Sequence, residues 1–394
     1  MHQSLVRVLN KIITMKNKTV YILGAGFAVE AGAPIQEKLI SEIFKVNEKA
    51  PHVFRDDSIA QFKNFLTNTL NIGERWHNTI PLEDIFTPLD SCIANNLSFR
   101  NLSVEKLKDK RQLVFELIGL TMQHILMTTP KDYITQFADY LVFKSKQRIS
   151  GNYKNCDPVS VLSTNWDILL DNSINLSIQD DDFNNTEQGV VDYCCHVSSY
   201  EKNDETVKPG LEILGRGGYN VKLLKLHGSL NWLLCPRCQR IYVKFYQKIA
   251  MNPFNGISNH SCRHCDKNFG KESSHRLVSN LIMPTYLKDL TNPQYKIIWQ
   301  NAGIELSEAK KIVFIGYSLP QADFEMRQLL ARMVDKKTEI EVVDIRGDKN
   351  PDNYDSLVRN YEQFFGRKIL SYEFGASKYI EEKIKPLIEA VSFN

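Results

Sequence analysis

The chain has 394 residues, which is long for one domain and short for three. Apolar residues make up 43% of the composition and charged residues 24%, so a sizeable core can form without disulfides. A net charge of +3 does not by itself imply binding to nucleic acid or to an anionic membrane, and no apolar stretch approaches the roughly 18 residues of a membrane span.

The first segment, residues 1–18, is predicted to form an amphipathic helix, because Leu5, Val8, Leu9 and Ile12 fall at helical spacing. It lacks the continuous apolar run and the small-residue cleavage site of a signal peptide, so we expect a cytoplasmic protein. This helix is expected to pack on the core or on a neighbouring subunit, and binding to a membrane surface is the alternative.

A strand, a glycine turn and a helix are predicted next. Residues 19–23 read TVYIL, Gly24, Ala25 and Gly26 follow at once, and a helical pattern runs from about 35 to 44. Glycines let the backbone approach a pyrophosphate, and a helix N-terminus favours its negative charge. The spacing departs from G-x-G-x-x-G, so a plain strand-to-helix turn is the alternative interpretation.

Helical patterns dominate residues 45 to 150, which we interpret as an inserted helical subdomain. Short apolar runs return at 159–162, 221–226 and 277–283, and again in KIVFIG and EIEVVDI, with a helix between these last two. The polar stretch 173–220 is predicted to form loops with weak strands. Short apolar strands alternating with helices indicate an α/β fold with a Rossmann-like, doubly wound parallel sheet.

Polar residues follow two of these strands directly. Thr164, Asn165 and Asp167 come after the run 159–162, and His227 follows the run 221–226. Open α/β sheets bind ligands at the carboxyl ends of their strands, so these side chains are candidates for a site. The alternatives are a helix cap made by Asn165 or Asp167 and a structural hydrogen bond made by His227.

A second glycine loop follows the strand KIVFI, and it contains Gly316, Tyr317, Ser318 and Leu319. The next strand, EIEVVDI, carries Asp344 near its end. An acid at such a position can hold the ribose hydroxyl groups of an adenosine. An ordinary loop and a solvated carboxylate are the alternatives.

Four of the eight cysteines form two Cys-x-x-Cys pairs, Cys235 with Cys238 and Cys262 with Cys265. In a chain without an export signal, this spacing predicts a four-cysteine zinc site rather than disulfides. Thiolates would fill all four positions, so the zinc would be structural and not catalytic. Replacement of one ligand by a nearby histidine and a nucleic-acid-binding zinc ribbon are the competing interpretations.

In this order, the motifs resemble those of the sirtuin family, over roughly residues 19–348. The resemblance implies an NAD-binding catalytic domain over that range, with Asn165, His227 and Asp167 as catalytic residues. It also implies that NAD contacts the two glycine loops and neighbouring strand ends, namely Gly24, Ala25, Gly26, Phe27, Thr164, Gly316, Tyr317, Ser318, Leu319 and Asp344.

The sequence departs from the sirtuin deacylases at several positions. Residues 35–37 read Ile-Gln-Glu where deacylases have Asp-Phe-Arg, and Ala28 stands where a serine is expected. The segment that carries Phe-Gly-Glu and docks the acyl-lysine peptide is missing, and LIMPTYLK at 281–288 takes its place. The chain therefore resembles the divergent bacterial sirtuin-like branch, whose members degrade NAD in defence against phage.

This resemblance implies an NAD glycohydrolase that releases nicotinamide and ADP-ribose. It would have a zinc module at about 233–268 and a strand and helix extension over 349–394. We expect NAD as substrate, zinc as metal, a homo-oligomer, and a partner ATPase or a phage protein as candidate activators. The alternatives are a protein deacylase or ADP-ribosyltransferase on the same fold, and a non-catalytic subunit that senses NAD or ADP-ribose.

Overall fold

The computed structural model of the protein describes residues 18–55, 57–126, 132–149, 156–184, 188–199, 207–245, 261–270, 275–346 and 351–392. The helix predicted for residues 1–18 lies outside these ranges except for Lys18. In the described ranges, no helix is long and apolar enough to cross a membrane.

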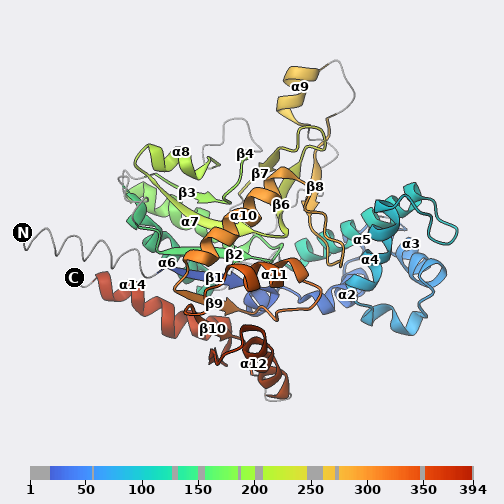
Figure 1. Ribbon diagram of the computed structural model, residues 1–394. Helices are drawn as coiled ribbons and strands as arrows, with labels where there is room; N and C mark the ends of the chain where they lie inside the picture. The colour runs from blue at the N-terminus through green and yellow to red at the C-terminus, as the bar shows by residue number, and fades with distance from the viewer. Residues whose placement is uncertain are drawn as a thin grey trace, which may run out of the picture.

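Seven parallel strands form the main sheet, in the order β11-β10-β9-β1-β2-β5-β3 (Figure 1). The predicted Rossmann-like, doubly wound sheet is therefore confirmed. The short apolar runs of the sequence form its central strands because both faces of such a sheet are covered. The strands are β1 (Thr19–Leu23), β2 (Val159–Ser163), β3 (Gly189–Asp192), β5 (Tyr219–Lys225), β9 (Lys311–Ile315), β10 (Glu339–Val343) and β11 (Leu370–Tyr372).

Helices cover both faces of this sheet. Tyr21 of β1 packs on Phe137 of α6 (Asp132–Ser145), with ring centroids 5.0 Å apart. Phe314 of β9 packs on Tyr361 of α12 (Pro351–Phe365) at 4.8 Å, on the opposite face. The other helices of this body are α7 (Leu169–Asn184), α8 (Gly210–Gly215), α10 (Pro293–Glu308), α11 (Phe324–Met333), α13 (Gly375–Tyr379), η8 (Ile380–Ile384) and α14 (Lys385–Ser392).

Helix α7 replaces part of the loop predicted for residues 173–220. The polar residues of this stretch suggested a loop, but Ser173 and Asn175 are only 4% and 8% exposed, and Asp171, in the preceding turn of the helix, is 1% exposed. The Asp171 carboxylate lies 3.2 Å from the Lys225 ammonium and accepts a hydrogen bond from the Tyr193 hydroxyl at 2.8 Å. Because protein partners satisfy these groups, a polar helix can occupy the interior.

A group of helices projects from one side of the sheet (Figure 1). The helix expected from about residue 35 becomes α-helical only at Leu39, after a 3-10 turn over Gln36–Lys38. The group comprises α2 (Leu39–Lys49), η3 (Pro51–Val53), α3 (Ser58–Asn64), η4 (Phe65–Thr69), η5 (Glu74–Thr79), α4 (Leu82–Ala94) and α5 (Val104–Ile125).

A second, smaller sheet has the strand order β4-β7-β6-β8. Its central strand follows β5 directly, after a turn at Leu226 and His227, so the two sheets are joined at the carboxyl end of β5. Cys235 and Cys238 lie between its strands β6 and β7, and Cys262 and Cys265 lie at the start of α9. The elements are β4 (Val197–Ser199), β6 (Gly228–Leu234), β7 (Ile241–Val243), β8 (Val278–Leu281) and α9 (Arg263–Phe269).

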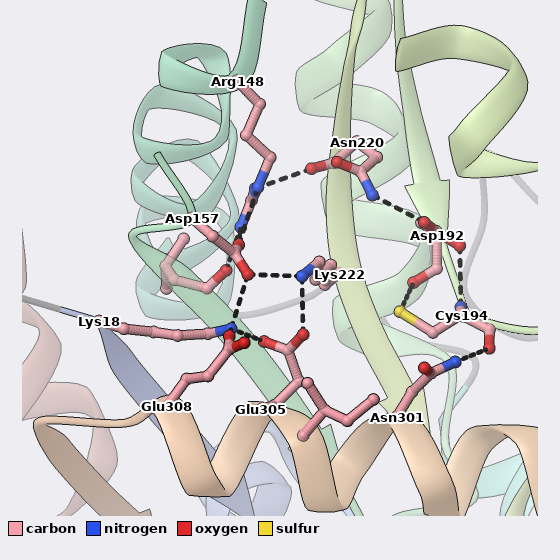
Figure 2. Close-up of polar contacts among 12 residues, drawn as sticks. Lys18, Arg148, Asp157, Asp192, Cys194, Asn220, Lys222, Asn301, Glu305 and Glu308 are labelled. Carbon is pink, nitrogen blue, oxygen red and sulfur yellow. Dashed lines mark hydrogen bonds and ion pairs between the residues drawn. The ribbon is translucent and has the colours of Figure 1, made fainter. Parts of the chain in front are cut away.

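Buried ions tie the amino ends of the strands together (Figure 2). Lys18, which precedes β1, and Lys222 of β5 both contact Asp157, each at 2.6 Å. Both lysines also contact Glu305 of α10, at 2.5 and 2.6 Å. Arg148 donates from Nε to Asp157 at 3.0 Å and from Nη1 to a backbone carbonyl at 2.9 Å. We call this set the amino-end ion network, and it joins the segment after α6, helix α10, strand β5 and the residues that precede β1 and β2.

Candidate functional site

The strand register places the residues that follow the central strands in one row. Leu23 pairs with both Ser163 and Ile315, and these pair in turn with Lys225 and Val343. The row therefore includes the first residues after five strands. In all five, the backbone amide donates to the last carbonyl of the adjacent strand at 2.9–3.1 Å: Gly24, Thr164, Leu226, Gly316 and Asp344.

This row includes the point where the order of the sheet reverses. From β1 the chain proceeds to β2 on one side, and it later returns to β9 and β10 on the other side. Open α/β sheets bind ligands at the carboxyl end of such a switch point, between the two strands where the order reverses. The carboxyl ends of β1 and β9 therefore mark the candidate site.

The two glycine loops meet here, backbone against backbone. The Gly26 amide donates to the Gly316 carbonyl at 2.9 Å. A Cβ added to Gly24 would lie 2.5 Å from the Gly316 oxygen, and one added to Gly26 would lie 2.6 Å from the Gly316 Cα. Gly316 itself has a φ of +61°, in the left-handed region that favours glycine. All three glycines are thus required by the contact between the loops, before any ligand is considered.

The first loop continues into a 3-10 helix, η1 (Ala25–Ala31). Phe27 is 2% exposed, so its side chain belongs to the core, whereas Ala25 and Gly26 are half-buried. The Tyr133 hydroxyl of α6 donates to the Phe27 carbonyl at 2.7 Å. Tyr133 was not identified from the sequence, because it lies within the stretch interpreted as an insertion.

The second loop offers one exposed side chain, that of Ser318. Tyr317 and Leu319 are each 4% exposed, so only their backbone can reach a ligand. The Tyr317 carbonyl accepts a hydrogen bond from Tyr361 at 2.6 Å, which fixes the loop to α12.

Asp344 directly follows β10, the strand next to β9 in the sheet. It is half-buried, and its Oδ1 accepts a hydrogen bond from the Ile345 amide at 2.7 Å. Burial raises the pKa of Asp344 above its ordinary value, against the effect of that hydrogen bond.

Asn165 lies directly beside the junction of the loops. It is 9% exposed, and its Nδ2 donates to the Gly24 carbonyl at 2.9 Å. Asp167 is 7% exposed, and its Oδ1 accepts from the Leu169 amide at 3.1 Å, at the start of α7. Burial raises the pKa of Asp167, although the nearby Lys225 ammonium opposes this shift. Asp167 thus makes the bond of a helix start, and its role toward NAD stays a prediction.

His227 follows β5 and has a side chain that is 13% exposed. Its backbone carbonyl accepts from the Ile282 amide at 2.9 Å, and its ring lies 6.4 Å from that of Trp299, centroid to centroid. Its Nε2 has no hydrogen-bond partner among the residues that the structure describes. The nearest carboxylate oxygen, Oδ1 of Asp323, is 3.4 Å away.

Asp323 and Lys288 are buried beside His227, and neither was singled out from the sequence. The Lys288 ammonium lies 2.8 Å from Asp323 Oδ1, and the Tyr317 hydroxyl donates to Oδ2 at 2.7 Å. Burial alone would raise the pKa of Asp323, but the neighbouring His227 and Lys288 lower it well below its ordinary value. No spacing rule links residues in two separate loops, so the sequence carried no signal for this pair.

The four paired cysteines converge on one point. Their sulfur atoms all lie within 4.8 Å of one another, with Cys235 and Cys265 at 3.8 Å and Cys238 and Cys262 at 3.6 Å. Tetrahedral zinc with Zn–S bonds of about 2.3 Å separates its sulfur ligands by about 3.8 Å, so the donor set fits zinc. The cluster excludes His264, and His260 lies outside the described residues.

Hydrogen bonds link the cysteine thiols to one another and to Tyr242. The Tyr242 hydroxyl lies 3.2 Å from the Cys262 sulfur. Although burial alone would raise the pKa of Cys262, hydrogen bonds from Tyr242, from the Cys265 backbone and from the neighbouring cysteines lower it to about 7. Burial and the same mutual hydrogen bonds raise the pKa of Cys238 and Cys265, so the four thiols share their protons as one group.

No protein-family model and no curated protein matches the chain. Among solved structures, it is similar to a triple mutant of a Sir2 homologue in complex with 2'-O-acetyl ADP ribose (13% identity, TM-score 0.44, covering 98% of this chain and 97% of that one). It is also similar to a Sir2 homologue mutant in complex with ADP ribose (12%, 0.43, 98% of both chains). A third is Sir2Tm bound to a propionylated peptide (12%, 0.36, 98% and 100%).

Proposed function

We propose that this protein hydrolyses NAD to nicotinamide and ADP-ribose. The observation that carries the proposal is the position of Asn165 and His227, which follow the adjacent strands β2 and β5 next to the junction of the glycine loops. Backbone without side chains can approach a pyrophosphate closely, and the switch point of the sheet supplies the crevice. An amide and an imidazole then stand at the edge of the same crevice.

The reaction requires a base and an oriented water but no acid. A bond forms between the water oxygen and C1′ of the ribose while the C1′–nitrogen bond breaks. The electron pair of that bond moves to the nicotinamide ring, which is cationic and becomes neutral on leaving. We assign the water proton to His227 and the orientation of ribose and water to Asn165. Asp167 fixes the start of α7 beside Asn165 and adds negative charge near the developing cation.

The segment after β8 favours water over a peptide as acceptor. Lys288 from this segment is 4% exposed and pairs with Asp323, beside His227. The Thr285 hydroxyl donates to the Thr87 hydroxyl of α4 at 3.4 Å, and the Tyr286 amide donates to the same oxygen at 3.2 Å. The stretch that replaces the peptide-docking segment is therefore held against α4 and the start of α11. This packing supports hydrolysis over deacylation.

We further propose that the cysteine cluster holds one structural zinc. Replacing a ligand, as in Cys235→Ser, should remove the metal and destabilise the small sheet, because metal binding is coupled to folding. Metal analysis and thermal melting on the same samples measure both effects. Folded wild-type protein that contains no zinc would contradict the proposal, and Cys92→Ser, outside the cluster, is the control.

Such an activity also needs a gate, because continuous hydrolysis would deplete NAD in the cell that makes the protein. We propose that the protein works inside the cell as a homo-oligomer. A partner ATPase or a phage protein is the candidate activator, in keeping with a role in anti-phage defence. Measuring turnover per molecule over a range of protein concentrations tests self-association as the gate.

The decisive experiment is incubation of the purified protein with NAD, following nicotinamide and ADP-ribose together. We expect equal amounts of both products in the absence of any peptide, and the protein concentration is varied as in the test of self-association. Nicotinamide release that requires an acyl-lysine peptide would instead identify a deacylase. Binding of NAD without cleavage at any concentration would favour the non-catalytic sensing subunit.

A further inference from the structure

The carboxylate of Asp323 is directed away from the helix that it precedes. An aspartate just before a helix ordinarily accepts hydrogen bonds from the first amides of that helix. Asp323 precedes α11 but makes no such side-chain bond. Its two oxygens are used by Tyr317 and Lys288, at 2.7 and 2.8 Å, and the residue is 4% exposed. The fold therefore holds this carboxylate in one orientation at the expense of a helix cap.

That orientation brings the carboxylate to His227. Asp323 Oδ1 lies 3.4 Å from Nε2 of the imidazole, a few tenths of an ångström beyond a hydrogen bond. Such contacts are often long in ligand-free sites and shorten when substrate binds. The other polar groups around this carboxylate are the Lys288 ammonium and the Tyr317 hydroxyl, with Glu325 behind Lys288 at 2.9 Å.

An ionised Asp323 can only accept hydrogen bonds. The Lys288 ammonium at 2.8 Å and the Tyr317 hydroxyl at 2.7 Å stabilise the carboxylate form inside the protein. A neutral imidazole carries one hydrogen, on either Nδ1 or Nε2. A carboxylate facing Nε2 selects the form with hydrogen on that atom, and Nδ1 then keeps its lone pair.

We propose that Asp323 is a positioning residue that holds His227 in the tautomer with hydrogen on Nε2, so that Nδ1 accepts the proton of the attacking water. The inference rests on the proposed hydrolysis of NAD, in which His227 is the base. Lys288 and Tyr317 fix Asp323, and the carboxylate balances the charge that His227 gains with the proton. After release of the products, Nδ1 returns this proton to solvent.

The tautomer can be read directly by nitrogen NMR of the His227 ring, without any turnover. We expect hydrogen on Nε2 in the wild type and a substantial shift toward Nδ1 in Asp323→Asn, because the amide of asparagine can donate to Nε2. The same substitution should lower kcat at least tenfold while KM changes less than about twofold, since the base is misoriented but NAD contacts remain.

Glu325→Gln is the matched control. Glu325 contacts the same Lys288 but is not paired with His227 among the described residues. We expect this variant to keep the wild-type tautomer and kcat. If it changed both as strongly as Asp323→Asn does, the effect would belong to Lys288 and the role assigned to Asp323 would be wrong.

Asp323→Asn with hydrogen still on Nε2 and an unchanged kcat would overturn the inference, even if the protein melted at a lower temperature. A wild type that never cleaves NAD would instead refute the proposed function, and the tautomer would still decide the role of Asp323. If Asp323→Asn does not fold, Tyr317→Phe frees one carboxylate oxygen and keeps the charge. A smaller change of tautomer and kcat in the same direction would support the inference, and no change would overturn it.

Discussion

The two ends of the parallel sheet use polar residues in opposite ways. At the amino end, Lys18, Arg148 and Lys222 are surrounded by carboxylates and carbonyls within 3.0 Å, so each charge is neutralised inside the protein (Figure 2). At the carboxyl end, the Ser318 side chain is exposed, and the His227 ring has no hydrogen bond within the described residues apart from the 3.4 Å approach of its Nε2 to Asp323. The basic groups of the amino end are thus paired within the protein, whereas the carboxyl end also presents groups that a ligand could engage.

This difference indicates how stability and chemistry are divided within one sheet. A buried polar group without a partner costs about 1–3 kcal/mol, so it persists mainly where it has a function. Paired ions recover most of their desolvation cost only when every charge is matched. Substitutions at the amino end should therefore change the free energy of unfolding, and those at the carboxyl end should change turnover.

The largest expected effect is at the carboxyl end. Asn165→Ala and His227→Ala should each lower NAD turnover by about a hundredfold to ten-thousandfold, because each removes an oriented dipole or a base. Binding should survive better, since most NAD contacts would lie on the phosphates and adenosine. Loss of the Asn165 bond to Gly24 should cost only about 1 kcal/mol of stability.

Asn301→Ala is the matched control for Asn165. It removes a similar bond outside the loop junction, between α10 and the segment that follows β3, where Nδ2 donates to the Cys194 carbonyl at 2.7 Å (Figure 2). We expect a comparable loss of stability with normal turnover. Nicotinamide release and thermal melting on the same samples separate the two effects, and wild-type turnover in Asn165→Ala or His227→Ala would remove that residue from the mechanism.

The next largest effect is expected from Asp157→Asn at the amino end. The change leaves Lys18, Lys222 and Arg148 around a neutral amide, so the folded state should lose about 3 kcal/mol. Turnover per folded molecule should not change. Denaturant unfolding measures the loss, and a turnover defect larger than tenfold would show that the two ends are not independent.

The contribution of Asp157 to the free energy of unfolding should decrease as the pH falls. Burial alone would raise its pKa, but Arg148, Lys222 and Lys18 lower it well below the ordinary value. A lowered pKa in the folded state stabilises the protein above the unfolded pKa of about 3.9, and this contribution is lost as pH falls toward the folded value. The stability difference between wild type and Asp157→Asn should therefore be full at neutral pH and shrink below about pH 4.

A smaller change is expected at the junction of the loops. A side chain in Gly26→Val would meet the Gly316 backbone, 2.6 Å from the added Cβ, so both loops must move at a cost of about 1–3 kcal/mol. We expect NAD binding to weaken at least tenfold, measured by calorimetry. Gly215→Val is the control, because nothing lies within 4 Å of a Cβ there. Unchanged binding by Gly26→Val would mean that the loop is only a turn.

The comparison also shows what could be predicted from the sequence. Strand ends carry signals that are local in the chain, such as Gly24 after TVYIL and Gly316 after KIVFI, and parallel register brings them together. The cysteine pairs are equally local, so their convergence was predictable from spacing alone. Local patterns of this kind suffice to place the sheet and the glycine loops.

Partners formed by tertiary packing were not predictable in this way. Lys288 and Asp323 lie in different loops, and each alone is an unremarkable charge in a polar context. The same limit applies to the part of α7 after residue 172, which was predicted as a loop, because the partners that bury this polar helix, such as those of Asp171, come from β5 and from Tyr193. Whether a charged residue is buried depends on which segments pack together in the fold, and the hydrophobic periodicity of the sequence does not predict this packing.

The smallest expected loss of stability is at Glu308, the exposed member of the amino-end ion network. Glu308 contacts Lys18 at 2.8 Å, but its side chain is 54% exposed, whereas that of Lys18 is 3% exposed. An exposed partner contributes little, because water already solvates it, so Glu308→Gln should cost less than about 1 kcal/mol of unfolding free energy. At 1 M salt, where the Debye length is about 3 Å, even this difference should vanish, while the loss in Asp157→Asn should largely remain. Denaturant unfolding of both variants at low and high salt measures the contrast. A loss in Glu308→Gln as large and as salt-resistant as that in Asp157→Asn would place the whole network in the interior and remove the distinction between its two parts.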